Sequence, residues 1–143
     1  MIPRISELAL KDEIEAYNIP QGVISHLYRD IASGKPGVLT KVGLGTFADP
    51  RIEGGKVNKS STDDLIELIT IKEEEYLFVP TFPIDVAILR GTVADKNGSI
   101  SMRNEALLID NLAQAMAAKN SGGIVIVQVE QAIQELLPSR QVD

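Results

Sequence analysis

Apolar and polar residues follow one another along the chain in patterns that predict both helices and strands. Helices are predicted over residues 6–13 (a short helix or a helix end), 22–33 and 104–119. In the second of these, Val23, Leu27 and Ile31 recur at helical spacing, and Gly34 follows as a helix stop. The pattern therefore predicts a helix with one apolar face.

Strands are predicted over residues 15–19, 38–42, 75–79, 85–93, 99–102 and 124–129. The runs 85–93 and 124–129 are almost continuously apolar, which is typical of strands buried on both faces. Asn97-Gly98 is a strong signal for a tight turn, so the following strand is predicted to fold back antiparallel. Residues 64–71 fit either a short helix or a strand.

This succession of elements predicts the α/β fold class. We expect an open, mostly parallel sheet with helices on both faces and one antiparallel hairpin. The sheet is expected to be incomplete, because the chain starts near a helix without a preceding strand. It also ends in a polar tail soon after a buried strand. Residues 1–143 are therefore expected to form a single α/β segment of something larger.

Composition removes several classes of function. A net charge of -6 and a pI near 4.8 argue against nucleic acid or a membrane surface as partner. The sequence has neither a signal peptide nor an apolar run long enough to span a bilayer, and this predicts a cytoplasmic protein. The absence of Cys and the single histidine, His26, argue against a disulfide, a thiol nucleophile and a metal site.

The glycine-rich segment 41–56 is the most informative stretch. It contains four glycines and a proline, is too irregular for a helix and is too long for a tight turn. Connections of this kind are usually functional or disordered, and Phe47 favours an ordered loop at a site. The start of the loop matches the relaxed pattern G-x-G-x-x-G/A, but Asp49-Pro50-Arg51 follows where a helix would have to begin. A dinucleotide site is therefore disfavoured.

A few polar residues near predicted strand ends are candidates for chemistry. Gln21 is either a turn residue that helps to satisfy the first helical N–H groups, or a neutral donor where open sheets place their ligands. His26 is interpreted as a solvated or partly packed residue, with a catalytic role as the alternative, and the run Glu73–Glu75 as a solvated turn. Glu130 follows a buried strand and could reach a cleft or start a helix. These residues alone specify no reaction.

Taken together, several stretches resemble the family I coenzyme A transferases, and among them the single-chain acetate/propionate type. The matching stretches are EAYNIPQGVISHLYRDIASGKPG, LTKVGLGTFADPR, EGGKVN, EEYLFVPTFPIDVAILRGTVADKNGSIS and NSGGIVIVQVE. Enzymes of this kind have two similar open α/β halves. The resemblance implies that this chain belongs to the first, α-like half and that the catalytic second half is absent.

The resemblance also implies a reaction. In the family, a glutamate of the second half attacks an acyl-CoA, and a glutamyl-CoA thioester forms in a ping-pong reaction between short-chain acyl-CoA and free carboxylates such as acetate, propionate, butyrate or acetoacetate. That places the protein in short-chain fatty acid and ketone-body metabolism. The Ser-Glu-Asn-Gly segment that carries the nucleophile is absent, so no catalytic residue is assigned and the chain alone is expected to be inactive.

Four substrate-binding residues are implied by the resemblance. Gln21 is expected to face the reacting carbonyl, and the backbone of Gly43, Gly45 and Thr46 is expected to wall the acyl pocket. Coenzyme A is implied as a substrate, with no permanently bound cofactor and no metal. The expected partners are acyl-CoA, a short-chain carboxylate, the missing β-like half and further copies in a homo-oligomer.

Two other interpretations stay open. One is another enzyme of the same broad fold, such as a sugar-phosphate isomerase or a citrate-lyase-like CoA carrier transferase. That enzyme would need phosphate-binding groups, for which only Lys41, Arg51 and Lys56 are available. The other is a non-catalytic module that binds acyl-CoA or a partner subunit.

Overall fold

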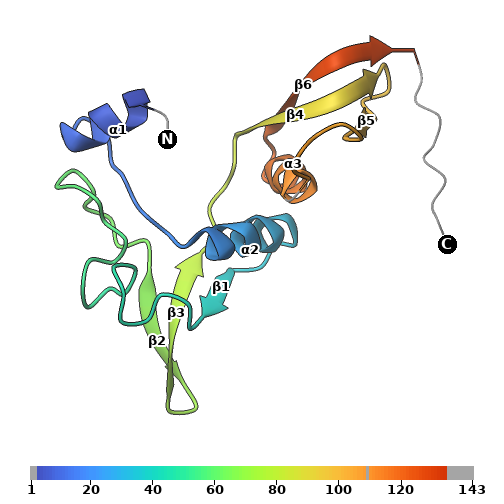
Figure 1. The fold of residues 1–143 in the computed structure, drawn as a ribbon. Coiled ribbons are helices and arrows are strands. Elements are labelled where there is room, and N and C mark those ends of the chain that lie inside the picture. The colour runs from blue at the N-terminus through green and yellow to red at the C-terminus, as the bar shows by residue number, and fades with distance from the viewer. Residues whose placement is uncertain (1–2, 109, 135–143) are drawn as a thin grey trace. The chain divides into compact units, whose positions relative to one another are not determined.

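The computed structural model describes residues 3–108 and 110–134, and its chain divides into two compact units, Met1–Phe82 and Pro83–Asp143 (Figure 1). Each unit has its own small sheet and at least one helix. They are therefore described separately, as unit 1 and unit 2.

Unit 1 combines two helices with an antiparallel sheet. Its elements are α1 (Pro3–Leu10), α2 (Gln21–Ala32), β1 (Gly37–Thr40), β2 (Glu67–Ile71) and β3 (Glu74–Pro80). The strand order is β1-β3-β2, and both pairs run antiparallel. The predicted apolar face of α2, Val23, Leu27 and Ile31, is buried, and the helix packs against β1. Gly34 follows α2 with φ of 69°, as expected for a helix stop.

The antiparallel pairing of β2 with β3 comes from a two-residue turn. Lys72 and Glu73 both have positive φ, 49° and 66°, and Ile71 pairs directly with Glu74. Turns of this kind match the natural twist of two antiparallel strands. The turn explains why residues 67–71 are a strand, which the pattern alone had left undecided.

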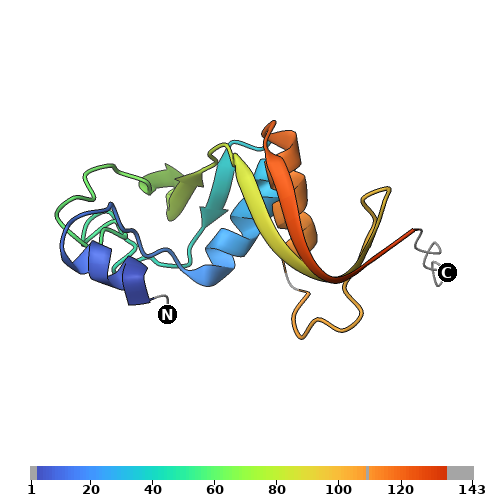
Figure 2. The same cartoon turned by 90° about the horizontal axis from the view of Figure 1, so that it is seen from above.

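Unit 2 is a βαβ arrangement with an added short strand. It contains β4 (Val86–Asp95), β5 (Ile100–Ser101), α3 (Asn111–Asn120) and β6 (Ile124–Ile133), in the order β5-β4-β6. β4 and β6 run parallel, and α3 connects them and packs against both (Figure 2). Ala87, Leu89 and Ala118 form the centre of the small core.

The predicted hairpin at Asn97-Gly98 is present. β5 pairs antiparallel with β4, and Gly98 has φ of 84°. The Asp95 carboxylate accepts hydrogen bonds from the N–H groups of Asn97 and Ser99, both at 2.9 Å. This side chain fixes the turn that the Asn-Gly pair makes sterically possible.

The α/β class is confirmed, whereas the arrangement of the strands differs from the expected mostly parallel sheet. The described residues form two three-stranded sheets, and β4–β6 is the one parallel pair. The physical reason lies in the connections: β2 and β3 are joined by a tight turn, which permits antiparallel pairing only. Residues 15–19 also differ, since Tyr17 contributes an isolated bridge rather than a strand.

Two further predictions for unit 2 need correction. The helix begins at Asn111 rather than at residue 104, because the preceding segment is bound to β4: the Asn104 N–H donates to the Thr92 hydroxyl at 3.0 Å, and Arg90 contacts the Glu105 carboxylate at 3.2 Å. Burial of the two long strands is also one-sided among the described residues, where the second apolar face stays exposed. α3 covers one face of β4 and β6, while Ile88 on the other face is 78% exposed.

Candidate functional site

The glycine-rich segment 41–56 is an ordered series of turns between β1 and β2 (Figure 1). The N–H groups of Ile52 and Gly54 donate to the carbonyl of Asp49 at 2.9 and 3.0 Å, and the Gly55 N–H donates to the Phe47 carbonyl at 2.8 Å. We call this segment the glycine loop. Its internal hydrogen bonds give it a defined shape, as the sequence predicts.

Gly43, Gly45 and Thr46 lie together at the start of the glycine loop. Gly43 and Gly45 have φ of 103° and 70°, in the region that residues with a side chain rarely adopt. The Thr46 hydroxyl donates to the Gly43 carbonyl at 2.8 Å and accepts from the Ala48 N–H at 3.3 Å. The Thr46 side chain thus connects the two ends of this turn, and Gly45 exposes backbone at its centre.

Gln21 is the first residue of α2 and is exposed. The capping residue before it is Pro20, and α2 has no side-chain cap. The structure therefore does not show the capping role that was the alternative interpretation of Gln21. Within residues 3–108 and 110–134, the Gln21 amide has no hydrogen-bond partner, so both its donors and its oxygen are available to a ligand.

The end of the glycine loop lies beside the segment that leads into Gln21. The Asn18 N–H donates to the Gly55 carbonyl at 2.7 Å, and the Val57 N–H donates to the Ala16 carbonyl at 2.9 Å. A Cβ atom on Gly55 would lie 3.0 Å from the Asn18 carbonyl oxygen, so glycine is needed for this close approach. The structure thus joins the loop to the Pro20-Gln21 turn through backbone, while no hydrogen bond within unit 1 links Gln21 to residues 43–46.

A group of charged residues holds the glycine loop in place, a role that the sequence did not indicate. Arg51 forms ion pairs with Asp49 at 2.8 Å and with Glu75 of β3 at 3.0 Å. Lys41, at the other end of the loop, pairs with Glu74 at 2.8 Å and lies 5.1 Å from the centre of the Tyr76 ring. Glu74 and Glu75 belong to the run interpreted as a solvated turn. In the structure, they connect β3 to the loop.

The electrostatics of this group follow from the contacts. Hydrogen bonds from the Arg51 side chain, and then from the Gly45 and Arg51 N–H groups, hold the pKa of Asp49 well below its usual range. The hydrogen bond from Lys41 lowers the pKa of Glu74, and Tyr76 adds to that effect. Both carboxylates are therefore ionised at neutral pH and are committed to holding the loop.

The three cations that a phosphate site would require all have carboxylate partners. Lys41 and Arg51 are paired as described, and Lys56 contacts Asp64 at 2.6 Å. A phosphate group would have to compete with these carboxylates for each cation. The geometry therefore gives no support to the sugar-phosphate isomerase interpretation.

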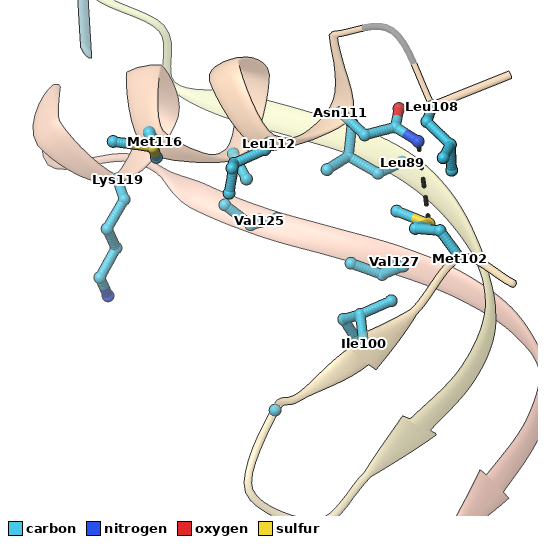
Figure 3. Close-up of a pocket in the computed structure, with 12 residues that line it drawn as sticks. Leu89, Ile100, Met102, Leu108, Asn111, Leu112, Met116, Lys119, Val125 and Val127 are labelled. Carbon is cyan, nitrogen blue, oxygen red and sulfur yellow. Dashed lines mark hydrogen bonds between the residues drawn. The ribbon is translucent and has the colours of Figure 1, made fainter. Parts of the chain in front are cut away.

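Unit 2 contains a separate apolar cleft of about 910 Å³ between α3 and the hairpin of β4 and β5 (Figure 3). Leu89, Val125 and Val127 form its floor, and Met116 and Lys119 come from α3. The Asn111 amide nitrogen lies 3.8 Å from the Met102 sulfur across it. None of the four predicted substrate-binding residues lines this cleft.

A metal site and a membrane-spanning helix are both absent from the described part of the chain. Among those residues, no group of three or more His, Asp or Glu side chains is placed to hold a metal ion. His26 is exposed on α2, and Glu130 of β6 pairs with Arg90 at 2.9 Å. Of the helices between residues 3 and 134, none has the length and apolar character that crossing a membrane requires.

The family model for coenzyme A transferase matches residues 2–142. The chain belongs to the coenzyme A transferase family. A caffeate CoA-transferase of Acetobacterium woodii is 55% identical over 139 residues, and acetate CoA-transferase YdiF of Escherichia coli K12 is 41% identical over 133 residues.

Solved structures agree with the sequence matches. The apoenzyme of the acyl-CoA transferase YdiF from E. coli O157:H7 has a TM-score of 0.90 and 40% identity, and the match covers 95% of this chain and 27% of that one. Glutaconate coenzyme A-transferase of Acidaminococcus fermentans, at 20% identity and a TM-score of 0.71, shares the fold. The matches confirm an enzyme by family and an α/β fold of CoA-transferase type.

The matches also define how much of such an enzyme is present. They cover 96% and 93% of this chain but 26% and 25% of the caffeate and acetate CoA-transferases. The chain thus spans about a quarter of the length of these relatives. The activity of a whole transferase is consequently a proposal for this chain, as are the roles of Gln21, Gly43, Gly45 and Thr46.

Proposed function

We propose that this chain is the part of a CoA transferase that receives the acyl group, and that it belongs to the α-like half. Gln21 donates from its amide to the carbonyl oxygen of the acyl group, and the backbone at Gly43, Gly45 and Thr46 forms one wall around that group. The observation that carries the proposal is the exposed, uncommitted Gln21 amide at the start of α2, joined through residues 16–18 to the end of the glycine loop.

The reaction proposed for the whole enzyme proceeds through a glutamate that this sequence does not contain. That carboxylate attacks the thioester carbonyl, the C–S bond breaks, and CoA leaves as a thiolate, so that an acyl-glutamyl anhydride remains on the enzyme. The thiolate then attacks the glutamyl carbonyl and releases the first acid as its carboxylate. The acceptor carboxylate repeats the two steps in reverse, so that CoA is transferred without a redox change or a permanently bound cofactor.

Gln21 has a defined task in this scheme. Negative charge develops on the carbonyl oxygen when the tetrahedral intermediate forms, and an amide N–H held at that point stabilises the charge. A neutral amide suits this role because its donors keep their charge state throughout the reaction. One donor of this kind typically contributes about 10²–10³ in rate.

Relatives with named activities outline the substrate class. Their names refer to caffeate, acetate, and acetoacetate with butyrate, all of which are carboxylates of small or moderate size. Short-chain acyl-CoA with acetate, propionate, butyrate or acetoacetate is therefore the first set of substrates to test. The competing function is a non-catalytic module that binds acyl-CoA. A transferase turns over its substrates, whereas such a module binds acyl-CoA without converting it.

The test is a transfer assay with the full-length protein that contains this segment. We expect CoA to move from acetyl-CoA to propionate with ping-pong kinetics. Incubation with acetyl-CoA alone should leave a protein-bound CoA adduct that is visible as a mass increase and lost on addition of acetate. Binding of acetyl-CoA without turnover or adduct would support the module and overturn the proposed function.

A further inference from the structure

The Asp49 carboxylate is buried inside the glycine loop, where ionised side chains are rare unless they are paired. Its side chain is 1% exposed. One oxygen accepts from the Gly45 N–H at 2.9 Å and from the Arg51 Nη2 at 2.8 Å. The other accepts from the Arg51 backbone N–H and from Nε, both at 3.0 Å. All four hydrogen bonds stay within the loop, and no part of the carboxylate is directed to solvent.

Arg51 extends this arrangement to the sheet. Its Nη1 contacts both carboxylate oxygens of Glu75, each at 3.0 Å, while Nε and Nη2 are bound to Asp49. A planar guanidinium held on two edges can occupy only one orientation. Arg51 therefore fixes the position of Asp49, and through it that of Gly45, relative to strand β3.

Gly45 depends on this anchor, because it has no side chain of its own to pack. Its φ is 70°, and nothing lies within 4 Å of the place where a Cβ would be. The backbone at this point is exposed and could adopt many conformations. The hydrogen bond from its N–H to Asp49 is the contact that Gly45 itself makes to select one of them, beside the bond of the Thr46 hydroxyl to the Gly43 carbonyl.

We propose that Asp49 is a positioning residue of the acyl site, which fixes the backbone wall at Gly43–Thr46 by accepting the Gly45 N–H while Arg51 and Glu75 fix Asp49. This inference rests on the proposed function, since it takes that wall to border the acyl group. Its consequence is selectivity for acyl size: a wall that is held fixed discriminates between acyl chains, and one that is free to move does so less.

Asp49→Asn tests the proposal with little change of shape. An amide has one acceptor and one NH₂ group where the carboxylate has two acceptors. Whichever way it turns, an NH₂ group faces either the Gly45 N–H or the Arg51 guanidinium. In the full-length transferase, we expect kcat/KM with acetyl-CoA to fall about 10²-fold, the typical effect of a misplaced active-site group. We also expect the ratio of kcat/KM for acetyl-CoA and butyryl-CoA to move several-fold closer to one, whichever of the two the unmodified enzyme prefers.

Two other variants separate positioning from general loss of stability. Glu75→Gln weakens only the outer contact of Arg51 and should change selectivity less than Asp49→Asn does. Thr92→Val removes a buried hydroxyl of unit 2, where it accepts from the Asn104 N–H at 3.0 Å. This control should lower the melting temperature and leave selectivity unchanged. If Asp49→Asn does not fold, Arg51→Lys, which keeps the charge but not the forked contact, takes its place.

A second measurement does not depend on activity. In the ¹⁵N-labelled 143-residue chain, the Gly45 amide should exchange at least 10-fold faster in Asp49→Asn than in the unmodified sequence. The Gly55 amide, which donates to the Phe47 carbonyl, should change less. The inference is overturned if Gly45 amide exchange is the same in Asp49→Asn as in the unmodified sequence. It is also overturned if Gly45 exchange becomes faster as expected while the acyl-CoA selectivity of the full-length enzyme stays unchanged. An unmodified enzyme without CoA transfer overturns the proposed function instead, and the exchange data still decide whether Asp49 anchors Gly45.

Discussion

Tyr17 and Lys56 pair as neighbouring residues in an antiparallel bridge. The bridge brings the end of the glycine loop beside the segment that enters α2, so that the two regions proposed to contact the acyl group share one backbone connection. Hydrogen bonds from Asn18 to Gly55 and from Val57 to Ala16 flank it. Movement of the loop end is thus expected to reach Gln21 through the main chain, without a side-chain intermediary.

Gln21→Ala in the full-length transferase should lower kcat and kcat/KM together by roughly 10²-fold, because the amide contact strengthens in the transition state. Steady-state kinetics with acetyl-CoA and propionate measure this. His26→Ala, an exposed position on the same helix, serves as the matched control and should have no effect. A change confined to KM, or one smaller than threefold, would remove Gln21 from the reaction.

The 143-residue chain by itself should show no CoA transfer between acetyl-CoA and propionate, butyrate or acetoacetate. The sequence lacks the Ser-Glu-Asn-Gly segment that carries the family's nucleophile. A discontinuous assay of acyl-CoA products would reveal any turnover. Robust turnover by the purified chain would show that a carboxylate within it acts as nucleophile, against the assignment of that role to a missing half.

Gly43→Ala and Gly45→Ala form a matched pair for the glycine loop. At Gly45 the added methyl group meets nothing within 4 Å, so the cost comes from the positive φ alone, about 1 kcal/mol. At Gly43 it would lie 3.0 Å from the Leu77 side chain and 3.1 Å from Ala48, which adds overpacking to a total of about 2–4 kcal/mol. Denaturant unfolding should therefore rank Gly43→Ala as the more destabilised. The opposite order would contradict the described packing.

The contribution of Asp49 to stability should depend on pH in a known direction. Its folded-state pKa is lowered, chiefly by Arg51 and then by the Gly45 N–H, with Glu75 facing the same guanidinium. A lowered pKa stabilises the fold above the unfolded-state pKa of about 3.9 and loses that effect as pH falls below it. The difference in melting temperature between the unmodified chain and Asp49→Asn should be constant from pH 6 to 8, roughly, and shrink below about pH 4.

If the difference grew as the pH fell, the sign of the pKa shift would be wrong. Glu75→Gln is the useful comparison, because Glu75 is half exposed and its pairing with Arg51 is open to water. Its effect on the melting temperature should be smaller at every pH and should weaken in high salt.

The 143-residue chain should associate with itself at micromolar concentration. In unit 2, the sheet face opposite α3 exposes Val86, Ile88, Ile124 and Ile126 by 45–78%. Contiguous apolar surface of this kind favours association. Sedimentation should show species larger than a monomer, and Ile88→Lys should shift the distribution toward monomer. Leu10→Lys, at an exposed apolar residue of α1, is the control and should have less effect.

Local signals account for the part of the fold that could be predicted. Gly34 and Asn97-Gly98 have few alternatives to the turns they form, and the apolar face of α2 is buried as its spacing predicts. The turn at Lys72 and Glu73 gave no such signal, since neither residue is one that favours positive φ. The start of α3 was misplaced because the contact of Asn104 with Thr92 is a long-range feature.

The candidate site, too, could be predicted from the sequence only in part. The glycine loop and Gln21 could be singled out from residue types and from a family resemblance. The role of Asp49 could not, because a carboxylate next to a proline and an arginine is ordinary on a surface, and its burial depends on how the loop closes. The pairing of Arg51 with Glu75 joins residues on separate elements, and no short motif predicts it.

Glu74 and Glu75 are successive residues of β3 and therefore point to opposite sides of the strand, yet each binds a cation of the glycine loop. A slip of one residue in the β2–β3 hairpin would exchange their sides and deprive Lys41 and Arg51 of their partners together. The register of the β2–β3 hairpin and the shape of the glycine loop therefore depend on each other. An insertion or deletion at the turn of Lys72 and Glu73 would therefore change the conformation of the proposed acyl wall, although the turn is not part of that wall.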